Sequence, residues 1–146
     1  DMVISVAKRV IRGEKLGFTI QDEEKATFTH KFDTKMAWMD AKMKNASLLS
    51  NEVRAFRGFP KSRLIIMNKD CIITEVLVVD KEKDRVFNGN YTFGDIILQE
   101  NGVKIDKKAK KIYLECFDGS ILEILSLQPA GKKEMLAAAF VNGYVK

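Results

Sequence analysis

The amino-acid sequence predicts a mainly β fold: a small closed or partly open barrel with flanking helices. Three observations support this fold class. From Arg63 onward, the apolar residues follow the two-residue period of strands. Turn residues separate five or six such runs at short spacing, and Asp118-Gly119 is the strongest hairpin signal in the chain. Helical periodicity is confined to residues before Gly58 and to the end of the chain.

The composition is that of a soluble globular protein. The chain has 146 residues, of which 46% are hydrophobic and 31% charged. That length can bury a core without disulfides or metals. No apolar run approaches the roughly 20 residues that a membrane span needs. Lys8 and Arg9 interrupt the apolar residues near the start, so we expect no signal peptide.

The first element is an amphipathic helix that ends before Gly13. Its apolar residues recur at helical spacing on one face: Val3, Val6, Ala7, Val10 and Ile11. No element precedes the helix to cover this face, so we expect the chain to be cut from something longer. Residues 14–33 have no sustained period and carry the acidic run Asp22-Glu23-Glu24, which indicates a linker or surface arm.

A second helix is predicted over residues 41–56. Leu49, Val53 and Phe56 would share its buried face, and Gly58 and Pro60 would end it.

Strands are predicted over the apolar runs that follow: Leu64–Met67, Cys71–Val79, Ile96–Gln99, Lys111–Phe117 and Ser120–Leu127. Asn68-Lys69-Asp70 is turn chemistry, residues 81–91 form a polar loop around Asn88-Gly89-Asn90, and Asn101-Gly102 ends the third run. A basic turn at Gly131-Lys132-Lys133 leads into a terminal helix over residues 136–144.

The net charge of +5 suggests an anionic partner, and the basic residues form three local clusters. The clusters are Arg54, Arg57, Lys61 and Arg63; Lys107, Lys108, Lys110 and Lys111; and Lys132 and Lys133. Small barrels with basic loops commonly bind oligonucleotides, and lysine and arginine contacts to phosphate supply sequence-independent affinity.

Each cluster also has a purely structural interpretation. The lysines at 107–111 could be a solvated hairpin tip, Arg54 could form a structural salt bridge, and Lys132 and Lys133 could simply start the final helix. Phe59, Tyr91, Phe93 and Tyr113 could stack on bases, although aromatic residues at strand spacing are more often part of a core.

Catalytic and metal-binding patterns are not found in the sequence. His30 has no partner placed for nucleophilic or proton-transfer work, and we expect it to be solvated. Cys71 and Cys116 lie within apolar runs, so we expect buried free thiols and a reducing compartment. There is no phosphate-binding glycine loop of the GxxxxGK type. The residues alone indicate a binding module rather than an enzyme.

Several motifs carry a family resemblance. The stretch Leu127-Gln128-Pro129-Ala130-Gly131-Lys132-Lys133-Glu134-Met135, followed by Ala137, Phe140, Asn142, Gly143 and Tyr144, closely resembles the ending of methionyl-tRNA formyltransferases. Residues 51–56 (Asn-Glu-Val-Arg-Ala-Phe) and Phe59-Pro60 resemble the family's Asn-x-x-Arg-Ala-Phe helix end and Trp-Pro turn. Gln21-Asp22-Glu23, Ala26-Thr27 and Lys31 resemble its linker, and Trp38 its Ile-Asp-Trp. Arg57-Gly58 replaces an Asn-Pro of that pattern, and Lys61 replaces a Gly.

The resemblance implies a domain organisation and an activity. Residues 1–50 would be the last helix of the catalytic domain plus the linker, and residues 51–146 an OB-like barrel domain of the Greek-key, partly open kind. The full-length enzyme would transfer a formyl group from 10-formyltetrahydrofolate to the amino group of methionyl initiator tRNA. Its Asn-His-Asp catalytic set and folate pocket would lie outside this sequence. The chain alone would then be inactive and hold no cofactor, catalytic residue or metal.

The resemblance also implies partners and a site. Initiator methionyl-tRNA and the enzyme's own N-terminal catalytic domain would be the partners, with no membrane contact. We expect a monomer in the bacterial cytoplasm or an organelle matrix. The tRNA-binding residues would be those of the basic clusters: Arg54, Arg57, Lys61, Arg63, Lys107, Lys108, Lys110, Lys111, Lys132 and Lys133.

Two alternatives to tRNA binding stay open. The barrel could act as a structural or interaction lid on its own catalytic domain. It could also be the equivalent domain of another folate-dependent formyl enzyme, one that acts on an amino sugar or hydrolyses formyl-folate, with no RNA role.

Overall fold

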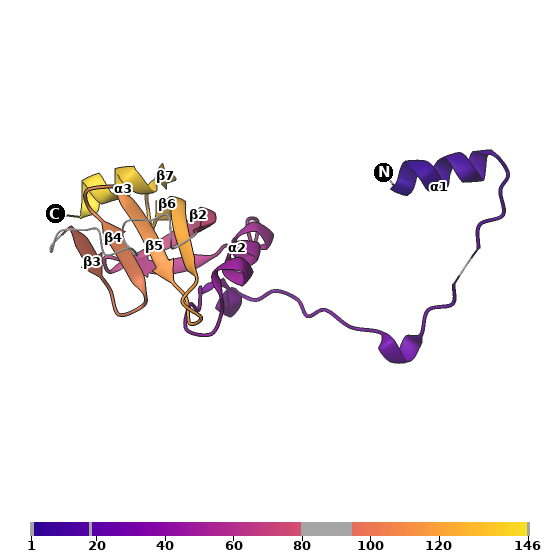
Figure 1. Cartoon of the computed structure of the whole chain (residues 1–146), viewed down its shortest axis with the longest axis horizontal. Coiled ribbons are helices and arrows are strands. Elements are labelled where there is room, and N and C mark those ends of the chain that lie inside the picture. Colours follow the sequence, from indigo (N-terminus) through magenta and orange to yellow (C-terminus); the bar gives the residue numbers. More distant parts are fainter. Residues whose placement is uncertain (1, 18, 80–94, 146) are drawn as a thin grey trace. The chain divides into compact units, whose positions relative to one another are not determined.

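The computed structural model describes residues 2–17, 19–79 and 95–145 (Figure 1). The chain forms two compact units, residues 1–31 and residues 32–146. The domain boundary after residue 50 stays a prediction. The predicted polar loop over residues 81–91, together with Tyr91 and Phe93, lies outside the described residues.

The first unit contains the predicted N-terminal helix, α1 (Met2–Ile11). Gly13 ends it in the left-handed conformation (φ 73°), and its N–H donates to the carbonyl oxygen of Val10 at 2.9 Å. None of the described α1 residues is buried. Further along, Asp22 caps a single 3-10 turn (Glu23–Lys25), and His30 is exposed as expected.

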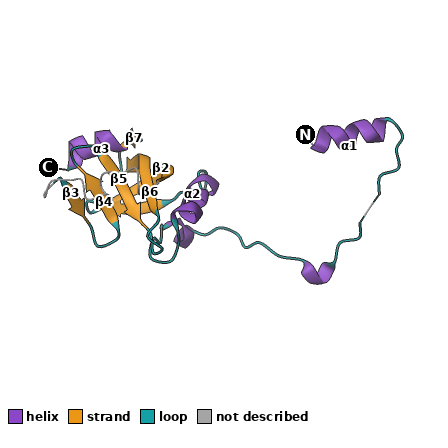
Figure 2. Ribbon diagram, viewed as in Figure 1, coloured by secondary structure: helices purple, strands orange, loops and turns teal. Residues whose placement is uncertain are grey.

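The second unit is built on an antiparallel sheet that curls into a half-barrel (Figure 2). Its strands are β1 (Arg63–Ile66), β2 (Lys69–Val79), β3 (Ile96–Leu98), β4 (Val103–Asp106), β5 (Lys111–Glu115), β6 (Ile121–Pro129) and β7 (Met135–Leu136). They lie in the order β1-β2-β6-β5-β4-β3, and β7 pairs with β6. The prediction of a mainly β fold with a partly open barrel and flanking helices is therefore confirmed. In the described part of the chain, no helix has the length and apolarity to cross a membrane.

The predicted second helix is present but begins later than expected, as α2 (Ala46–Ala55). The residues before it form a turn, in which the N–H of Lys44 donates to the carbonyl oxygen of Asp40 at 3.1 Å. Asn45 is the N-cap, and its side chain accepts the N–H of Leu48 at 2.8 Å. The expected apolar face is confirmed, because Leu49, Val53 and Phe56 are all buried.

Two long strands, β2 and β6, form the centre of the sheet, and α2 packs against both. Their register shifts at Thr74, because Ile73 pairs with Leu127 while Glu75 pairs with Ser126. Thr74 is thus the extra residue of a β-bulge, a feature that bends a strand and redirects a side chain. The predicted Asp118-Gly119 turn is confirmed between β5 and β6, with Gly119 at φ 75°.

Two strands were missing from the sequence prediction, β4 and the two-residue β7. Residues 103–106 form β4, which pairs with both β3 and β5, whereas the prediction placed no strand there. Val103 and Ile105 are buried, while the intervening Lys104 forms an ion pair with Glu115 at 2.9 Å. β4 also turns residues 107–110 into the tip of a β4–β5 hairpin, as we expect for that lysine cluster.

The core lies between the concave sheet and the helices. Ile112, Leu114 and Cys116 alternate into it as predicted. Tyr113, on the opposite face of β5, is also buried and packs with Ile121 in a second small cluster, so both faces of this strand are covered. Cys71 and Cys116 are buried free thiols, as predicted.

The C-terminal helix is α3 (Ala137–Tyr144), which packs on β5, β6 and β7. The strand β7 separates it from the basic turn after β6. Lys132 and Lys133 therefore do not start the final helix, which was one of the two interpretations open from the sequence.

Candidate nucleic-acid interface

The first basic cluster is displayed at the tip of the β4–β5 hairpin. Lys107, Lys108 and Lys110 are exposed there. Asp106 fixes the turn, because its carboxylate accepts the N–H of Ala109 at 2.8 Å. Lys111 differs from the other three, since it is half-buried at the start of β5 and forms an ion pair with Glu123 at 3.2 Å.

The second cluster divides into exposed and occupied side chains. Arg54 and Arg57 extend from the last turn of α2 and the residues after it, and Lys61 follows in the loop to β1; all three are exposed. Arg54 donates to the side-chain oxygen of Asn51 at 2.9 Å rather than to a carboxylate.

Arg63, the fourth member, has structural partners. Its guanidinium binds both carboxylate oxygens of Asp70 and lies 5.4 Å from the centre of the Trp38 ring. The backbone next to Trp38 is also bonded to β1, because the N–H of Met39 donates to the carbonyl oxygen of Arg63 at 3.0 Å. Arg63 thus fastens residues 38–39 to the edge of β1.

The third cluster lies in the turn between β6 and β7. The N–H of Lys132 donates to the carbonyl oxygen of Pro129 at 3.0 Å, and the Gln128 amide donates to the carbonyl oxygen of Lys132 at 2.8 Å. These bonds use the backbone of the turn and leave the side chains of Lys132 and Lys133 exposed.

The fold brings three members of the second cluster, Arg54, Arg57 and Lys61, onto a surface that extends to the β6–β7 turn. Two adjoining hollows lie along α2, β2 and β6, and they share Arg57 and Thr74. Arg54 lines the hollow nearer α2; Lys61, Gln128 and Glu134 line the hollow nearer the β6–β7 turn. Sequence patterns did not indicate that Thr74, Gln128 or Glu134 belongs to this surface, because only the pairing of β6 with β2 and with β7 brings them together.

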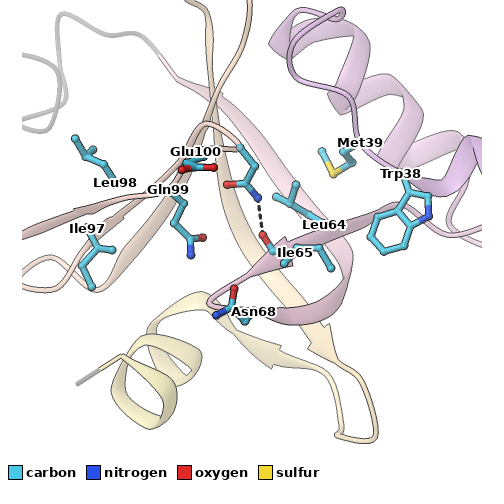
Figure 3. Close-up of a pocket in the computed structure, with 10 residues that line it drawn as sticks. Trp38, Met39, Leu64, Ile65, Asn68, Ile97, Leu98, Gln99 and Glu100 are labelled. Atoms are coloured by element: carbon cyan, nitrogen blue, oxygen red, sulfur yellow. Dashed lines mark hydrogen bonds between the residues drawn. The ribbon is translucent and has the colours of Figure 1, made fainter.

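A further hollow, of about 610 Å³, has a different chemistry (Figure 3). It lies at the open side of the half-barrel, between β1 and the β3–β4 region. Apolar and amide side chains line it, with Glu100 as its charged residue: Trp38, Met39, Leu64, Ile65, Asn68, Ile97, Leu98, Gln99, Glu100 and Asn101. No lysine or arginine is among them, so this hollow offers no charge for a phosphate.

Of the aromatic residues considered as stacking platforms, the structure describes two. Tyr113 is buried in the core, whereas Phe59 is 57% exposed beside the basic loop after α2. Phe59 therefore keeps a free ring next to Arg57 and Lys61 in the sequence, and base–aromatic stacking is compatible with its exposure.

The thiols are shielded rather than reactive. Burial, aided by the Asp70 carboxylate, raises the pKa of Cys71 to about 11, and burial also raises the pKa of Cys116. A thiol needs a lowered pKa and exposure to act as a nucleophile. The two cysteines therefore serve as core residues.

Comparison with known sequences gives the family. The family described as the C-terminal domain of formyl transferases matches residues 31–145. The chain belongs to this family. The match covers the whole of the second unit up to Val145, including all three basic clusters.

Three relatives of this formyl transferase domain are named methionyl-tRNA formyltransferase. The protein from Lactococcus lactis subsp. lactis is 29% identical over 143 residues, 98% of this chain and 40% of its own length. That from Methylococcus capsulatus is 29% identical over 92% of the chain and 38% of its own length. That from Latilactobacillus sakei is 27% identical over 88% of the chain and 36% of its own length. The chain thus spans about 40% of the length of the relatives that it matches.

Proposed function

We propose that this chain is the C-terminal, tRNA-binding part of a methionyl-tRNA formyltransferase. The full-length enzyme would use 10-formyltetrahydrofolate to formylate methionyl initiator tRNA. Residues 1–50 would comprise the last helix of the catalytic domain and the linker. The chain alone would be catalytically inactive, because the catalytic set would belong to the domain before it.

One observation carries the proposal of RNA binding. Eight of the ten predicted contact residues have exposed side chains, and within the described ranges none of the eight forms an ion pair: Arg54, Arg57, Lys61, Lys107, Lys108, Lys110, Lys132 and Lys133. Cations that are not already neutralised by carboxylates can neutralise phosphates. Arg63 and Lys111 are the two with carboxylate partners, and we assign them a smaller share of the binding.

The proposal is tested by filter binding of initiator tRNA to the chain across a salt series. Affinity should fall as salt rises, and the logarithm of the binding constant should lose roughly 0.7 to 0.9 per phosphate contact for each tenfold rise in salt. Replacing Lys107 and Lys108 by Glu should weaken binding without unfolding the chain, because both side chains are exposed. Lys111 is left intact to preserve its pair with Glu123.

The matched control reverses two exposed lysines outside the clusters, Lys35→Glu with Lys42→Glu. It changes the net charge equally and should weaken binding less. A folded chain that fails to bind tRNA even at low salt would contradict the proposal. If the two double variants lost tRNA affinity equally, the attraction would depend on net charge alone. That outcome would support the alternative that the barrel acts as a lid on its own catalytic domain.

A further inference from the structure

The hollow between α2 and the β6–β7 turn is small and polar. Its volume is about 210 Å³, and Arg57, Lys61, Ile72, Ile73, Thr74, Gln128 and Glu134 line it. Pockets for drug-sized ligands hold roughly 300 to 1,000 Å³. This one suits a single small group rather than a nucleoside.

Local structure fixes the position of the two cations. α2 ends at Ala55, which leaves Arg57 just beyond its last turn. The chain then returns so that the N–H of Lys61 donates to the carbonyl oxygen of Phe56 at 2.9 Å. Both cations therefore lie at one end of the helix and line the same hollow.

Thr74 supplies a hydroxyl that has no partner within the described residues. It is the bulged residue of β2, and its Oγ1 atom is buried without a hydrogen bond. A buried polar atom without a partner is costly, so such atoms are normally satisfied by protein, water or ligand. Since Thr74 lines the hollow, a change of its χ1 rotamer would bring this buried O–H to a ligand oxygen there.

The charges of the lining favour an anion. Arg57 and Lys61 contribute two positive charges against the single negative charge of Glu134, and none of these three residues forms an ion pair within the described ranges. An arginine guanidinium can donate two parallel hydrogen bonds to a phosphate, and lysine acts on it as a point charge.

We propose that this hollow is a subsite for one backbone phosphate of the bound RNA. Arg57 and Lys61 neutralise the phosphate, and the Thr74 hydroxyl donates to one of its oxygens. Glu134, on the rim, opposes the anion and limits the affinity. This inference rests on the proposed tRNA-binding function and names the group that the site takes.

The first test measures tRNA affinity over a salt series with single variants of the 146-residue chain. Arg57→Gln and Lys61→Asn should each weaken binding and reduce the salt slope by about 1. Asn is chosen because Lys61 has φ 68°, a conformation that Asn tolerates. Thr74→Val should weaken binding severalfold with the salt slope unchanged, because it removes a neutral donor.

Glu134→Gln gives the sharpest result, since misfolding cannot mimic a gain. It should tighten tRNA binding by about threefold, the scale of one exposed charge interaction. If the pocket held a cation or no ligand, this variant would bind tRNA more weakly or with unchanged affinity. Lys35→Gln is the control for the loss of one exposed charge. It should weaken tRNA binding less than Arg57→Gln or Lys61→Asn does.

The second test uses inorganic phosphate with NMR of the backbone amides. Phosphate should shift the Thr74 and Lys61 signals in the unaltered chain, and the Arg57→Gln variant should abolish these shifts. If tRNA binds but neither test distinguishes the pocket variants from Lys35→Gln, the subsite is wrong and the proposed function stands. If the folded chain shows the phosphate shifts yet binds no tRNA, the assignment of the phosphate to RNA is overturned, and so is the proposed function.

Discussion

Cys71 shows what burial does to a single side chain. The residue has no exposed surface and lies in β2 next to Asp70. Loss of hydration disfavours the thiolate, and the neighbouring carboxylate adds to this, so the pKa rises from 9.0 to about 11. The folded chain therefore holds the thiol proton more tightly than the unfolded chain does.

This shift predicts a loss of stability at high pH. Below pH 9 both states carry the proton, and the thiol does not affect the free energy of unfolding. Between about pH 9 and about pH 11 the unfolded state releases the proton first, so the free energy of unfolding falls as pH rises. Urea unfolding at pH 8, 9, 10 and 11 measures it, and the Cys71→Val variant should show a shallower decline. Parallel declines in the two chains would contradict the assignment.

Two basic residues illustrate how far sequence could identify the contact residues. Arg63 and Lys111 look the same in the sequence as Lys61 and Lys110, but strand pairing gives them carboxylate partners. Asp70 pairs with Ile65 across the β1–β2 hairpin and so lies diagonally from Arg63, and Glu123 reaches Lys111 from β6. Partners set by the register of a sheet cannot be assigned until that register is known. Thr74, Gln128 and Glu134 were missed for the same reason.

Among the elements, the β3–β4 turn depends on one glycine. Gly102 has φ 85°, and a Cβ atom added there would lie 2.8 Å from the carbonyl oxygen of Glu115 on β5. The turn therefore needs both the left-handed conformation and a close approach of two backbones. Gly131, in the β6–β7 turn, has a similar φ of 72°, but a Cβ atom added there would have no neighbouring atom within 4 Å.

These two glycines form a matched pair of variants. Gly131→Ala should cost about 1 kcal/mol in the free energy of unfolding, because only the backbone conformation is strained. Gly102→Ala should cost about 2 to 4 kcal/mol, because the clash with β5 adds to that strain. Thermal or urea unfolding of both variants checks this difference. Equal costs would mean that the β3–β4 turn moves freely away from β5.

The strand β4 and the start of α2 show why element boundaries were less predictable than the fold class. β4 alternates apolar and charged residues, but it has only four residues, and so short a run is a weak signal of the two-residue period of strands. The helix was predicted to begin at residue 41, five residues before the observed start of α2. Asp40 and Asn45 instead make a turn and a cap there. Long runs such as β2 and β6 were predictable because many apolar residues follow one another between turn signals.

For the whole molecule, the second unit contains every buried residue among those described. They run from Ala37 to Val141, whereas α1 contributes none. A segment without buried groups adds little to the cooperativity of unfolding. The stability of the chain should therefore reside in residues 32–146.

Two truncations test this division. Removing residues 1–31 should change the free energy of unfolding by less than about 0.5 kcal/mol. Removing residues 1–45 should cost more, because it deletes the buried residues Ala37, Met39 and Ala41 and the Asn45 cap of α2. Urea unfolding of both chains measures the difference. A large loss from the first truncation would show that the arm stabilises the barrel.

The amide side chains at the open side of the half-barrel have a consequence for self-association. Asn101 donates to the carbonyl oxygen of Ile65 at 2.7 Å, and Gln99 accepts the N–H of Met67 at 3.4 Å. A third backbone group on the same edge of β1, the carbonyl oxygen of Arg63, accepts the N–H of Met39. An exposed strand edge is a template for pairing with another chain. With these groups occupied, β1 is a poor template for a strand of a second molecule, and this side of the barrel can remain open without promoting pairing between chains.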